Sequence, residues 1–599
     1  MKTITILLAL LAGSMYNKAN AQFNFQRSWG TYFGDERFVF TDSAVDNAGN
    51  LYVIGTLDGN TSTNFPVFTN TTAFHPNYGG GQTDGFLVKF NPEGTLVWGT
   101  FIGGEAEEEL MAIDIDRDNN IYIVGDTNSA SGITTPNSYQ VNYAGNHDFF
   151  IAKFNENGTI LWSTYYGGTE SELNTLDLAS FNNFPKRVHI TLDGSGYFYI
   201  AGYAGSTNLA TADVFQETRG NSNQIIAKFD VLGNRIWATY FGQNTAIASL
   251  KADNSGVYVA GMTLDCPPNY TYNTYYGTTN GFKPLPDNCR ELFLNKFTPN
   301  GQREWGTYYG GAATEQVSSN SIALTSDSVF LAGMAPNYLN QEVATANSYQ
   351  PNCNGSSNFM AQFHKNGTRI QGTYNGNPQP LQTTGAPSNV ATDEDNNYYN
   401  FGATALIDIA SGDGFKTSPS NYYSLDGFVC KFDPNNNRLW GTYYGGEGAE
   451  RNVRFHAYDN GTKFYIIGAT NSQNAIATPN SYQTTKNCFD CDNIIPSEIT
   501  NIFFTHFEPL PLAAPNFNAT SVTLYPNPAK TTVSIAVNNP DNQKLNLEFY
   551  DILGKKVLEF QEYISPTNID VSQMSTGIYL VKMTNENNES LTQKLVITN

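Results

Sequence analysis

The sequence predicts an all-β protein that consists of a seven-bladed β-propeller and a small C-terminal β-sandwich. A Trp-x-Thr motif recurs seven times, at intervals of 64 to 75 residues, and its copies hold all six tryptophans of the chain. Short segments rich in aromatic and β-branched residues lie between the copies, bounded by Gly, Asn, Asp and Pro, as is typical of strands. Four such segments in each interval, repeated seven times, predict a propeller.

The Trp-x-Thr motif marks the fourth strand of each repeat. In every copy Thr follows the first position by two residues and Gly follows it by five. The copies begin at Trp29, Trp98, Trp162, Trp237, Trp305, Gln371 and Trp440. The first strand follows the Gly-Gly turn, as at 110–114, the second has the form Tyr-x-x-Gly, as at 122–125, and the third ends in Lys-Phe, as at 153–154.

The two ends of the repeat region indicate how the ring closes. Residues 27–34 form a lone fourth-strand motif at the start, and residues 501–507 form a lone third-strand motif at the end. One strand is therefore spare at the start and one is missing from the last blade. Pairing them removes two open sheet edges, which would otherwise promote aggregation. We therefore expect the N-terminal strand to complete the last blade.

The first 21 residues have the features of a secretory signal peptide. Lys2 precedes an apolar run from Ile4 to Leu11, and Ala19-Asn-Ala21 forms a cleavage site before Gln22. No second apolar run approaches the ~20 residues of a membrane-spanning helix, so no transmembrane segment is expected. The predicted organisation is a signal peptide at 1–21, a propeller at 22–508, a Pro-rich linker at 509–517 and a C-terminal domain at 518–599.

The six cysteines are too few for a disulfide framework in a chain of this length. Cys266 and Cys289 lie in one long loop of the fourth repeat, and the oxidising compartment favours a disulfide between them. Cys488 and Cys491 form a Cys-x-x-Cys pair in the seventh repeat. A local disulfide or free thiols are favoured over zinc there, because no second pair with zinc spacing exists. Cys430 falls in a third strand and is expected to be a small core residue.

The repeats resemble a known family of secreted bacterial proteins. The strings at 116–125, 152–155 and 162–168 are similar to the SBBP-type β-propeller repeat, and the resemblance covers about residues 23–508. The resemblance implies a propeller fold and an extracellular or surface location. It implies no agreed activity and no catalytic residues.

The C-terminal segments resemble a second family. The strings at 524–528, 550–556, 574–580 and 593–597 are similar, in that order, to the sorting domain of type IX secretion cargo. The resemblance implies a small β-sandwich that the type IX secretion machinery recognises, and a secreted or outer-surface location. The residues of the sorting motif are Tyr525, Pro526, Asn527, Pro528, Gly554, Gly577, Tyr579 and Lys594.

Acidic residues follow the Gly-Gly turns between repeats. They are Glu36, Glu108, Glu172, Glu315 and Glu450. In one interpretation each carboxylate accepts backbone N–H groups of its tight turn. In the other, the acids form a partial ring at the mouth of the channel that binds a cation or sugar hydroxyls. Ile247 and Leu381 interrupt such a ring in the fourth and sixth repeats, which favours the first interpretation.

Other segments offer weaker signals of chemistry. The loop motif at 135–140 recurs at 345–350 and 478–483, and this repetition favours packing over a binding site. The segments 114–118 and 393–395 begin like calcium loops but lack the closing Glu, so hairpin turns are favoured and calcium is the one cofactor left open. The sequence has no His-Glu-x-x-His, no Gly-x-Ser-x-Gly and no phosphate loop, and no catalytic residue is proposed.

The composition narrows the function. A net charge of −22 argues against a nucleic-acid partner, because phosphate attraction needs a basic surface. Exposed Tyr, Asn, Asp and Thr in the long loops suit stacking and hydrogen bonding. The sequence therefore predicts a secreted or cell-surface module that binds or adheres to glycan or protein ligands. The alternative is an extracellular polysaccharide-active enzyme, a glycosidase or lyase, with a carboxylate site on the loop-rich face of the propeller.

Overall fold

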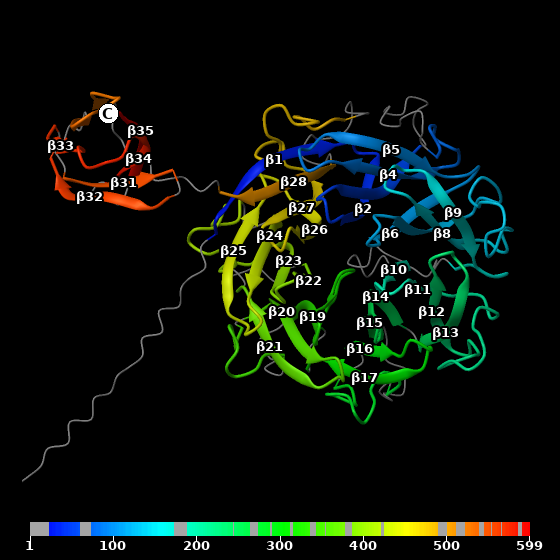
Figure 1. Ribbon diagram of the computed structural model, residues 1–599. Coiled ribbons are helices and arrows are strands. Elements are labelled where there is room, and N and C mark those ends of the chain that lie inside the picture. Colours follow the sequence, from blue (N-terminus) through cyan, green and yellow to red (C-terminus); the bar gives the residue numbers. More distant parts are fainter. Residues whose placement is uncertain are drawn as a thin grey trace, which may run out of the picture. The chain divides into compact units, whose positions relative to one another are not determined.

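The computed structural model describes the chain as strands, turns and loops (Figure 1). The described residues are 23–59, 74–172, 188–243, 245–263, 274–287, 290–311, 315–335, 343–353, 355–377, 386–420, 424–488, 500–510, 522–537, 544–552, 554–564, 566–584 and 590–598. Among them is no helix with the length and apolar character needed to cross a membrane. The chain divides into two compact units, Met1–Pro509 and Leu510–Asn599. The predicted signal peptide at 1–21 lies outside the described residues.

Seven four-stranded antiparallel sheets make up the described part of the first unit. Blade 1 contains β2 (Phe38–Val45), β3 (Leu51–Asp58), β4 (Thr83–Phe90) and β5 (Leu96–Ile102). Blade 2 contains β6 (Glu108–Ile115), β7 (Ile121–Thr127), β8 (Asp148–Phe154) and β9 (Ile160–Tyr166). Blade 3 contains β10 (Val188–Leu192), β11 (Tyr197–Tyr203), β12 (Ser222–Asp230) and β13 (Arg235–Gln243). Blade 4 contains β14 (Thr245–Asp253), β15 (Gly256–Thr263), β16 (Leu292–Phe297) and β17 (Arg303–Tyr309).

The remaining three blades repeat the same order. Blade 5 contains β18 (Ile322–Leu324), β19 (Ser328–Ala335), β20 (Ser357–His364) and β21 (Arg369–Asn375). Blade 6 contains β22 (Asn389–Thr392), β23 (Tyr398–Thr404), β24 (Asp426–Phe432) and β25 (Arg438–Tyr444). Blade 7 contains β26 (Glu450–Tyr458), β27 (Lys463–Thr470), β28 (Asn501–Pro509) and β1 (Phe25–Phe33).

The blades form a closed ring with their first strands innermost (Figure 1). These strands contact one another in the order β2, β6, β10, β14, β18, β22 and β26, and β26 contacts β2 again. The last blade is completed by β1, which pairs antiparallel with β28 so that Trp29 lies opposite His506 and Tyr32 opposite Phe503. The predicted propeller fold, with the N-terminal strand in the last blade, is confirmed.

The tryptophan of the fourth strand holds the neighbouring blade in place. Its indole Nε1 donates to a backbone carbonyl in the turn between the third and fourth strands of the next blade. These bonds join Trp29 to Pro92 (2.7 Å), Trp98 to Glu156 (3.1 Å), Trp162 to Val231 (3.1 Å), Trp237 to Pro299 (2.8 Å) and Trp305 to Lys365 (2.9 Å). The turn requires glycine, since Gly158 has a φ of +79° and a Cβ there would lie 3.0 Å from the Trp98 ring.

The threonine of the motif fastens the long loop between the second and third strands to the outer edge of a blade. Its Oγ1 accepts a backbone N–H from that loop in all seven blades. The donor–acceptor pairs are His75–Thr100, Gln140–Thr164, Gln216–Thr239, Lys283–Thr307, Gln350–Thr373, Lys416–Thr442 and Gln483–Thr31, at 2.8 to 3.0 Å. The loops thereby cover strand edges that would otherwise pair with another chain. This is the packing role that repetition of the loop motif favours.

The apolar core of the propeller lies between neighbouring blades. In one cluster, buried Tyr122 and Phe149 of blade 2 pack with Phe198 and Phe229 of blade 3. Strands that are buried on both faces explain the nearly continuous apolar runs of the repeats, because each sheet contacts a sheet on either side. The described apolar clusters therefore lie between blades and not at the centre of the ring. Polar side chains of the first strands line the axis.

The C-terminal unit is a two-sheet β-sandwich with a core of its own. One sheet has the strand order β29 (Val522–Tyr525), β30 (Thr532–Val537) and β33 (Asn568–Asp570). The other has the order β32 (Lys556–Tyr563), β31 (Leu545–Asp551), β34 (Gly577–Thr584) and β35 (Ser590–Ile597). Buried Val533 and Ile535 of the first sheet pack with Phe549, Val581 and Leu595 of the second. This is the small sandwich that the sequence predicts.

Candidate functional site

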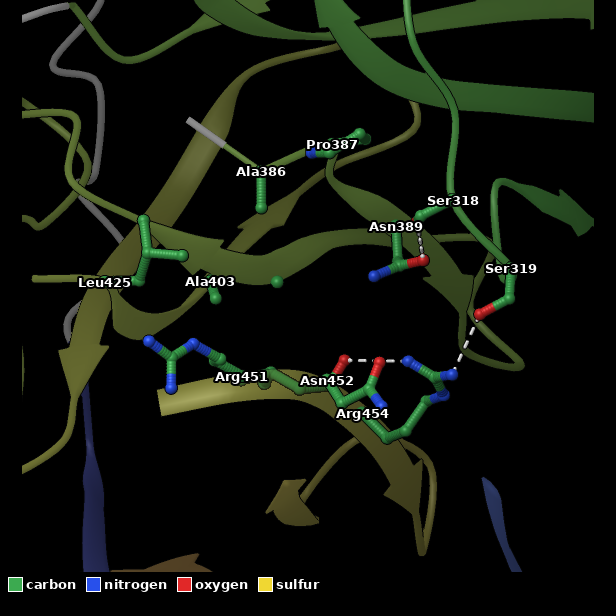
Figure 2. A pocket seen from close by; sticks show the side chains of 12 residues that line it. Ser318, Ser319, Ala386, Pro387, Asn389, Ala403, Leu425, Arg451, Asn452 and Arg454 are labelled. Atoms are coloured by element: carbon green, nitrogen blue, oxygen red, sulfur yellow. Dashed lines mark hydrogen bonds between the residues drawn. The ribbon is translucent and has the colours of Figure 1, made fainter. Parts of the chain in front are cut away.

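The first strands of the blades surround two adjoining cavities. The axial cavity, of about 170 Å³, is lined by side chains of six blades, including Asp42, Asp114, His189, Lys251, Asn320 and His456. The arginine pocket, of about 380 Å³, is lined by elements of blades 5, 6 and 7, including Ser318, Pro387, Asn389, Leu425, Arg451 and Arg454 (Figure 2). Ser319 lines both cavities, so they meet near the inner edge of blade 5.

Polar residues around the axis differ from blade to blade, unlike the motifs that build the blades. One residue of each first strand pairs with the position two after the repeated Tyr or Phe of the second strand. This position holds Asp42, Ala112, His189, Ser249, Ser321, Asn389 and Arg454 in blades 1 to 7. The sequence motifs did not indicate these residues. The signal that finds them is variation in size and charge at one register position of otherwise repeated strands.

Arg454 joins three blades through a buried guanidinium. Its Nε lies 3.3 Å from Asp42 Oδ1 in blade 1, and its Nη2 donates to Ser319 Oγ at 2.8 Å in blade 5. Burial lowers the pKa of Arg454, and the neighbouring Asp42 carboxylate opposes this shift. Because a buried ion pair is costly to break, Arg454 forms a fixed part of the wall of the arginine pocket.

Arg451 turns its side chain toward the arginine pocket (Figure 2). A β-bulge lies between Arg451 and Arg454, and Asn452 within the bulge has a φ of +54°. Bulges re-aim side chains along a strand. Here the bulge places one arginine inside the ring and leaves the other exposed.

Asn389 lies across the pocket from Arg451 (Figure 2). Its Oδ1 accepts hydrogen bonds from Ser318 Oγ and, at 3.2 Å, from Asn320 N. These two bonds fix the amide so that its Nδ2 is the group left to face the pocket. Pro387 and Leu425 supply an apolar wall, and the described residues that line the pocket include no Asp or Glu. The arrangement offers N–H donors and positive charge beside an apolar surface.

The charged groups of the axial cavity that bond to other side chains or to the backbone do so within the ring. Asp114 accepts two backbone N–H groups, each at 2.9 Å. Burial raises the pKa of Asp114, while the nearby Lys251 charge acts to lower it. His456 Nε2 lies 2.9 Å from Ser43 Oγ of blade 1. The cavity's two unrepeated carboxylates, Asp42 and Asp114, therefore serve contacts within the ring.

The acids that the sequence offered as a channel-mouth ring lie in the crossings between blades. Glu108, Glu172, Glu315 and Glu450 are fully buried, and each accepts the backbone N–H of a glycine four residues earlier. The donors are Gly104 (2.7 Å), Gly168 (3.2 Å), Gly311 (3.4 Å) and Gly446 (3.5 Å). Glu36 is partly exposed, and none of the five is among the described residues that line the two cavities. These contacts match the turn-capping interpretation, and the structure does not bring the five carboxylates together.

A second buried acid accompanies each of those four glutamates, which the sequence motifs did not indicate. Asp84, Asp148, Glu291 and Asp426 lie at the start of the third strand, each 24 residues before its glutamate. A Cβ on Gly167 would lie 2.2 Å from Asp148 Oδ1 and 2.8 Å from Glu172 Oε2, which explains the glycine five residues after the tryptophan. Burial raises the pKa of Asp148 to about 6 and that of Glu172 to about 7. In blades 4 and 6 the corresponding acids form ion pairs with Lys283 and Lys416.

The cysteines are only partly described. Cys266 and Cys289 lie outside the described residues, and their bond stays a prediction. Cys488 is disulfide-bonded, while Cys491 lies outside the described residues. Cys430 on β24 is a buried free thiol, as expected for a small core residue.

The two segments that begin like calcium loops are hairpin turns. Asp116 Oδ1 accepts the N–H groups of Asp118 and Asn120 at 3.0 and 2.8 Å. Asp393 makes the same pair of bonds in blade 6, at 3.1 and 2.9 Å. Within the described ranges, no group of three or more His, Cys, Asp or Glu side chains could hold a metal ion.

Comparison with protein families decides the role of the C-terminal unit. Residues 523–598 match the family model of the secretion system C-terminal sorting domain. This segment is a type IX sorting domain. The protein is therefore delivered by type IX secretion to the cell surface or the extracellular space, and the secretion machinery is the partner of the sorting domain.

Residues of the sorting motif hold the sorting domain together. Asn527 Nδ2 donates to the carbonyl of Lys594 at 2.8 Å, and its Oδ1 accepts the N–H of Val596 at 2.9 Å, so the Tyr525–Pro528 segment is pinned to β35. The other motif residues shape turns and strand ends: Gly554 has a φ of +80°, Gly577 opens β34, and Tyr579 OH donates to Ser575 O at 2.9 Å.

The chain is also similar, at low identity, to proteins of several kinds. It is 23% identical over 348 residues to an uncharacterised WD repeat-containing protein of Acanthamoeba polyphaga mimivirus, which covers 50% of this chain and 25% of that protein. The chain thus spans about a quarter of the length of this curated relative. Similar solved structures include the polysaccharide lyase Uly1 (11% identity, 78% of this chain and 89% of that chain, TM-score 0.35) and the phage phi92 endosialidase (11%, 95% and 88%, 0.33). PorZ of the type IX secretion system of Porphyromonas gingivalis follows (12%, 94% and 82%, 0.22). Similarity at this level transfers no ligand and no activity.

Proposed function

We propose that the protein is a cell-surface or secreted binding and adhesion module whose propeller takes a glycan or protein ligand in the arginine pocket. One observation carries the proposal. The polar residues Arg451, Arg454 and Asn389 of the pocket are unrepeated in an otherwise repetitive ring, and the exposed Arg451 and oriented Asn389 face a space of about 380 Å³. A repeated residue serves each blade equally, whereas an unrepeated cluster at one place on a rigid scaffold suits a single ligand.

The dimensions and chemistry of the pocket support binding. Small-ligand sites have volumes of about 300–1,000 Å³ and combine apolar walls with a few placed polar groups. Leu425 and Pro387 form such a wall, and Asn389 is held in one orientation by its own hydrogen bonds. Arg454 is fixed by Asp42, so the site is preorganised before any ligand arrives.

The alternative of a polysaccharide-active enzyme finds less support in these contacts. A glycosidase needs two carboxyl groups that flank the scissile bond. The described lining of the arginine pocket provides N–H donors, and the two unrepeated carboxylates of the axial cavity are engaged within the ring. The geometry therefore favours recognition over bond cleavage.

A ligand screen of the purified full chain tests the proposal. Glycan arrays and pull-down from the native surface would identify ligands, and Leu425→Trp would then be compared with Leu232→Trp. Leu425 lines the pocket, whereas Leu232 is 72% exposed in a distant hairpin turn. We expect Leu425→Trp to weaken binding at least about 10-fold, and Leu232→Trp to leave it unchanged.

Two outcomes would contradict the proposal. Equal binding by both tryptophan variants would place the ligand elsewhere on the propeller. New reducing or unsaturated ends in a glycan incubated with the protein would replace a binding role with an enzymatic one.

A further inference from the structure

We infer that the ligand of the arginine pocket is an acidic sugar residue, whose carboxylate binds Arg451 and whose ring lies against the apolar wall. This inference rests on the proposed binding function and names its ligand class. It is carried by the state of Arg451, by the orientation of Asn389 and by the make-up of the pocket wall.

Arg451 has no anionic partner among the residues that the structure describes. The chain has 54 acids against 32 basic residues, so an arginine would be expected to find a carboxylate. Among the described residues, however, the Arg451 side chain makes no ion pair and no hydrogen bond. Glu450, its neighbour in sequence, is fully buried and bonds to Thr470 and Ser472 hydroxyls, each at 2.7 Å. The planar guanidinium therefore keeps its donors for a group from outside, and it matches a carboxylate in bidentate geometry.

Asn389 adds a donor that the ring does not use. Only 4% of this residue is exposed, and its Oδ1 is occupied by Ser318 and Asn320. The Nδ2 group consequently faces the pocket as a donor with no acceptor on it among the described residues (Figure 2). A ligand oxygen in the pocket would accept a hydrogen bond from this group. The Arg451 guanidinium and the Asn389 amide therefore both offer hydrogen-bond donors to acceptor atoms of a ligand.

The rest of the pocket suits a sugar ring. Pro387, Ala403 and Leu425 form an apolar wall that can contact the C–H face of a pyranose, while the donors take its oxygens. A space of about 380 Å³ falls in the lower part of the range for small-molecule sites, which fits one residue of a polymer. The absence of Asp and Glu from the described lining spares an acidic ligand the like-charge repulsion that the rest of this chain, at −22, would impose.

The experiment uses the purified full chain and matched pairs of glycans. Oligosaccharides that contain galacturonate, glucuronate, mannuronate or guluronate would be compared with their carboxyl-reduced forms by calorimetry. We expect the acidic form of one or more pairs to bind and its reduced partner to bind about 10- to 100-fold more weakly, as for the loss of a charge-assisted hydrogen bond.

Variants connect the preference to Arg451. Arg451→Gln should lower affinity for the acidic form about 10- to 100-fold and remove the preference over the reduced form. Arg451→Lys, which keeps the charge but not the bidentate fork, should give an intermediate affinity. The matched control is Arg117→Gln, because Arg117 is also exposed and lies in the turn after β6, outside the lining of the pocket. A melting curve of each variant checks that the propeller stays folded.

The failures are distinguishable. Equal binding of acidic and reduced glycans that Leu425→Trp still abolishes would overturn the acidic ligand and leave the proposed function standing. Preference for a poly-glutamate peptide over every uronate would assign the pocket to an acidic peptide and overturn the inference. Undiminished binding by Arg451→Gln, or binding to no glycan of the panel, would overturn it as well.

Discussion

At the residue scale, blade 5 shows which side chains of the repeat depend on one another. In blades 1 to 4 and 6 a lysine of the third strand lies over the ring of the repeated tyrosine, as Lys153 lies 4.7 Å from the Tyr122 centroid. Blade 5 has Gln362 in the lysine position and Gln371 in the tryptophan position, and Gln371 Nε2 donates to Gln362 Oε1 at 2.8 Å. The following turn holds Asn436 where other turns hold glycine. In the other turns glycine leaves room for the indole of the preceding blade. Gln371 has no indole, so the turn of blade 6 accommodates Asn436, and the residues at positions 362, 371 and 436 differ together from the repeat.

The indole bond between blades predicts a measurable cost. Trp305→Phe keeps the apolar ring but removes the N–H that donates to the Lys365 carbonyl. We expect the free energy of unfolding to fall by about 1–3 kcal/mol, the usual effect of leaving a buried hydrogen-bond partner unsatisfied. Trp440→Phe is the matched control, because Trp440 is also buried and its indole makes no hydrogen bond among the described residues. Urea unfolding followed by circular dichroism measures the free energy of unfolding of both variants. Equal losses would show that the indole hydrogen bond between blades does not stabilise the propeller.

At the element scale, the crossings between blades bring together groups of like charge. The crossings that hold Asp84 with Glu108 and Asp148 with Glu172 bury two carboxyl groups each. Lys283 and Lys416 balance the charge at two other crossings. Burial of the carboxyl groups is the main reason for their raised pKa values, and the nearby carboxylate of Glu108 adds to the shift at Asp84.

Stability should therefore fall as the pH rises. Burial raises the pKa of Asp84, Glu172 and Glu450 to about 7 and that of Asp148 to about 6, above the usual values of about 4 in an unfolded chain. The folded state then holds protons that the unfolded state releases between about pH 4 and 7, so its stability is greatest below that window and is lost through it. Melting temperatures from pH 4 to 8 should decrease accordingly.

A single substitution isolates one of these groups. Asp148→Asn keeps an oxygen to accept the Ala144 N–H and adds an amide that can donate to Glu172. We expect a flatter pH profile and a gain on the order of 3 kcal/mol at pH 8, which corresponds to about two pKa units. Asp433→Asn, in a partly exposed hairpin turn, is the control and should leave the profile unchanged. An unaltered slope in Asp148→Asn would contradict the assignment.

The sequence predicts the strands and their pairing better than it predicts the residues of the candidate site. The order of the strand motifs predicts the pairing of 27–34 with 501–507, because each strand of a repeat has its own short motif. The cluster of Asp42 and Arg454 is different, since its members lie in different blades and meet only when the ring closes. Their types also vary at that register position, so no motif connects them. The glutamates that follow the Gly-Gly turns are visible in the sequence, but the acid buried beside each lies 24 residues earlier, at the third strand of the preceding blade, and no motif indicated it.

At the scale of the whole molecule, closure of the ring depends on one short N-terminal strand. β1 covers the edge of β28, and its Thr31 and Tyr32 bond to the loop that precedes β28. Because the two strands come from opposite ends of the propeller sequence, their pairing closes the ring. An open β28 would present unpaired backbone groups to other chains.

Deleting residues 23–34 should open the ring without removing any other blade. We expect a lower melting temperature and concentration-dependent association through β28, both measurable by calorimetry and light scattering. A peptide of residues 23–34 added in trans should restore the monomer by strand addition, whereas a scrambled peptide should not. A truncated protein that stays monomeric and melts like the intact one would show that β1 is dispensable for closure.

The sorting domain should be needed for export and not for the stability of the propeller. Each unit has its own apolar core, and the ring of the propeller is completed by β1 and β28, both within the first unit. Deleting residues 516–599 should therefore leave the melting curve of the propeller and its ligand binding nearly unchanged. The same deletion should abolish delivery outside the cell, with the protein retained in the periplasm because the predicted signal peptide still acts.

The substitution Asn527→Ala tests the sorting domain more mildly. It removes both hydrogen bonds to β35 and should reduce export while the propeller melts normally. Fractionation of cells and calorimetry of the purified proteins separate the two roles, and normal export of the truncated chain or collapse of its propeller would refute the division of labour.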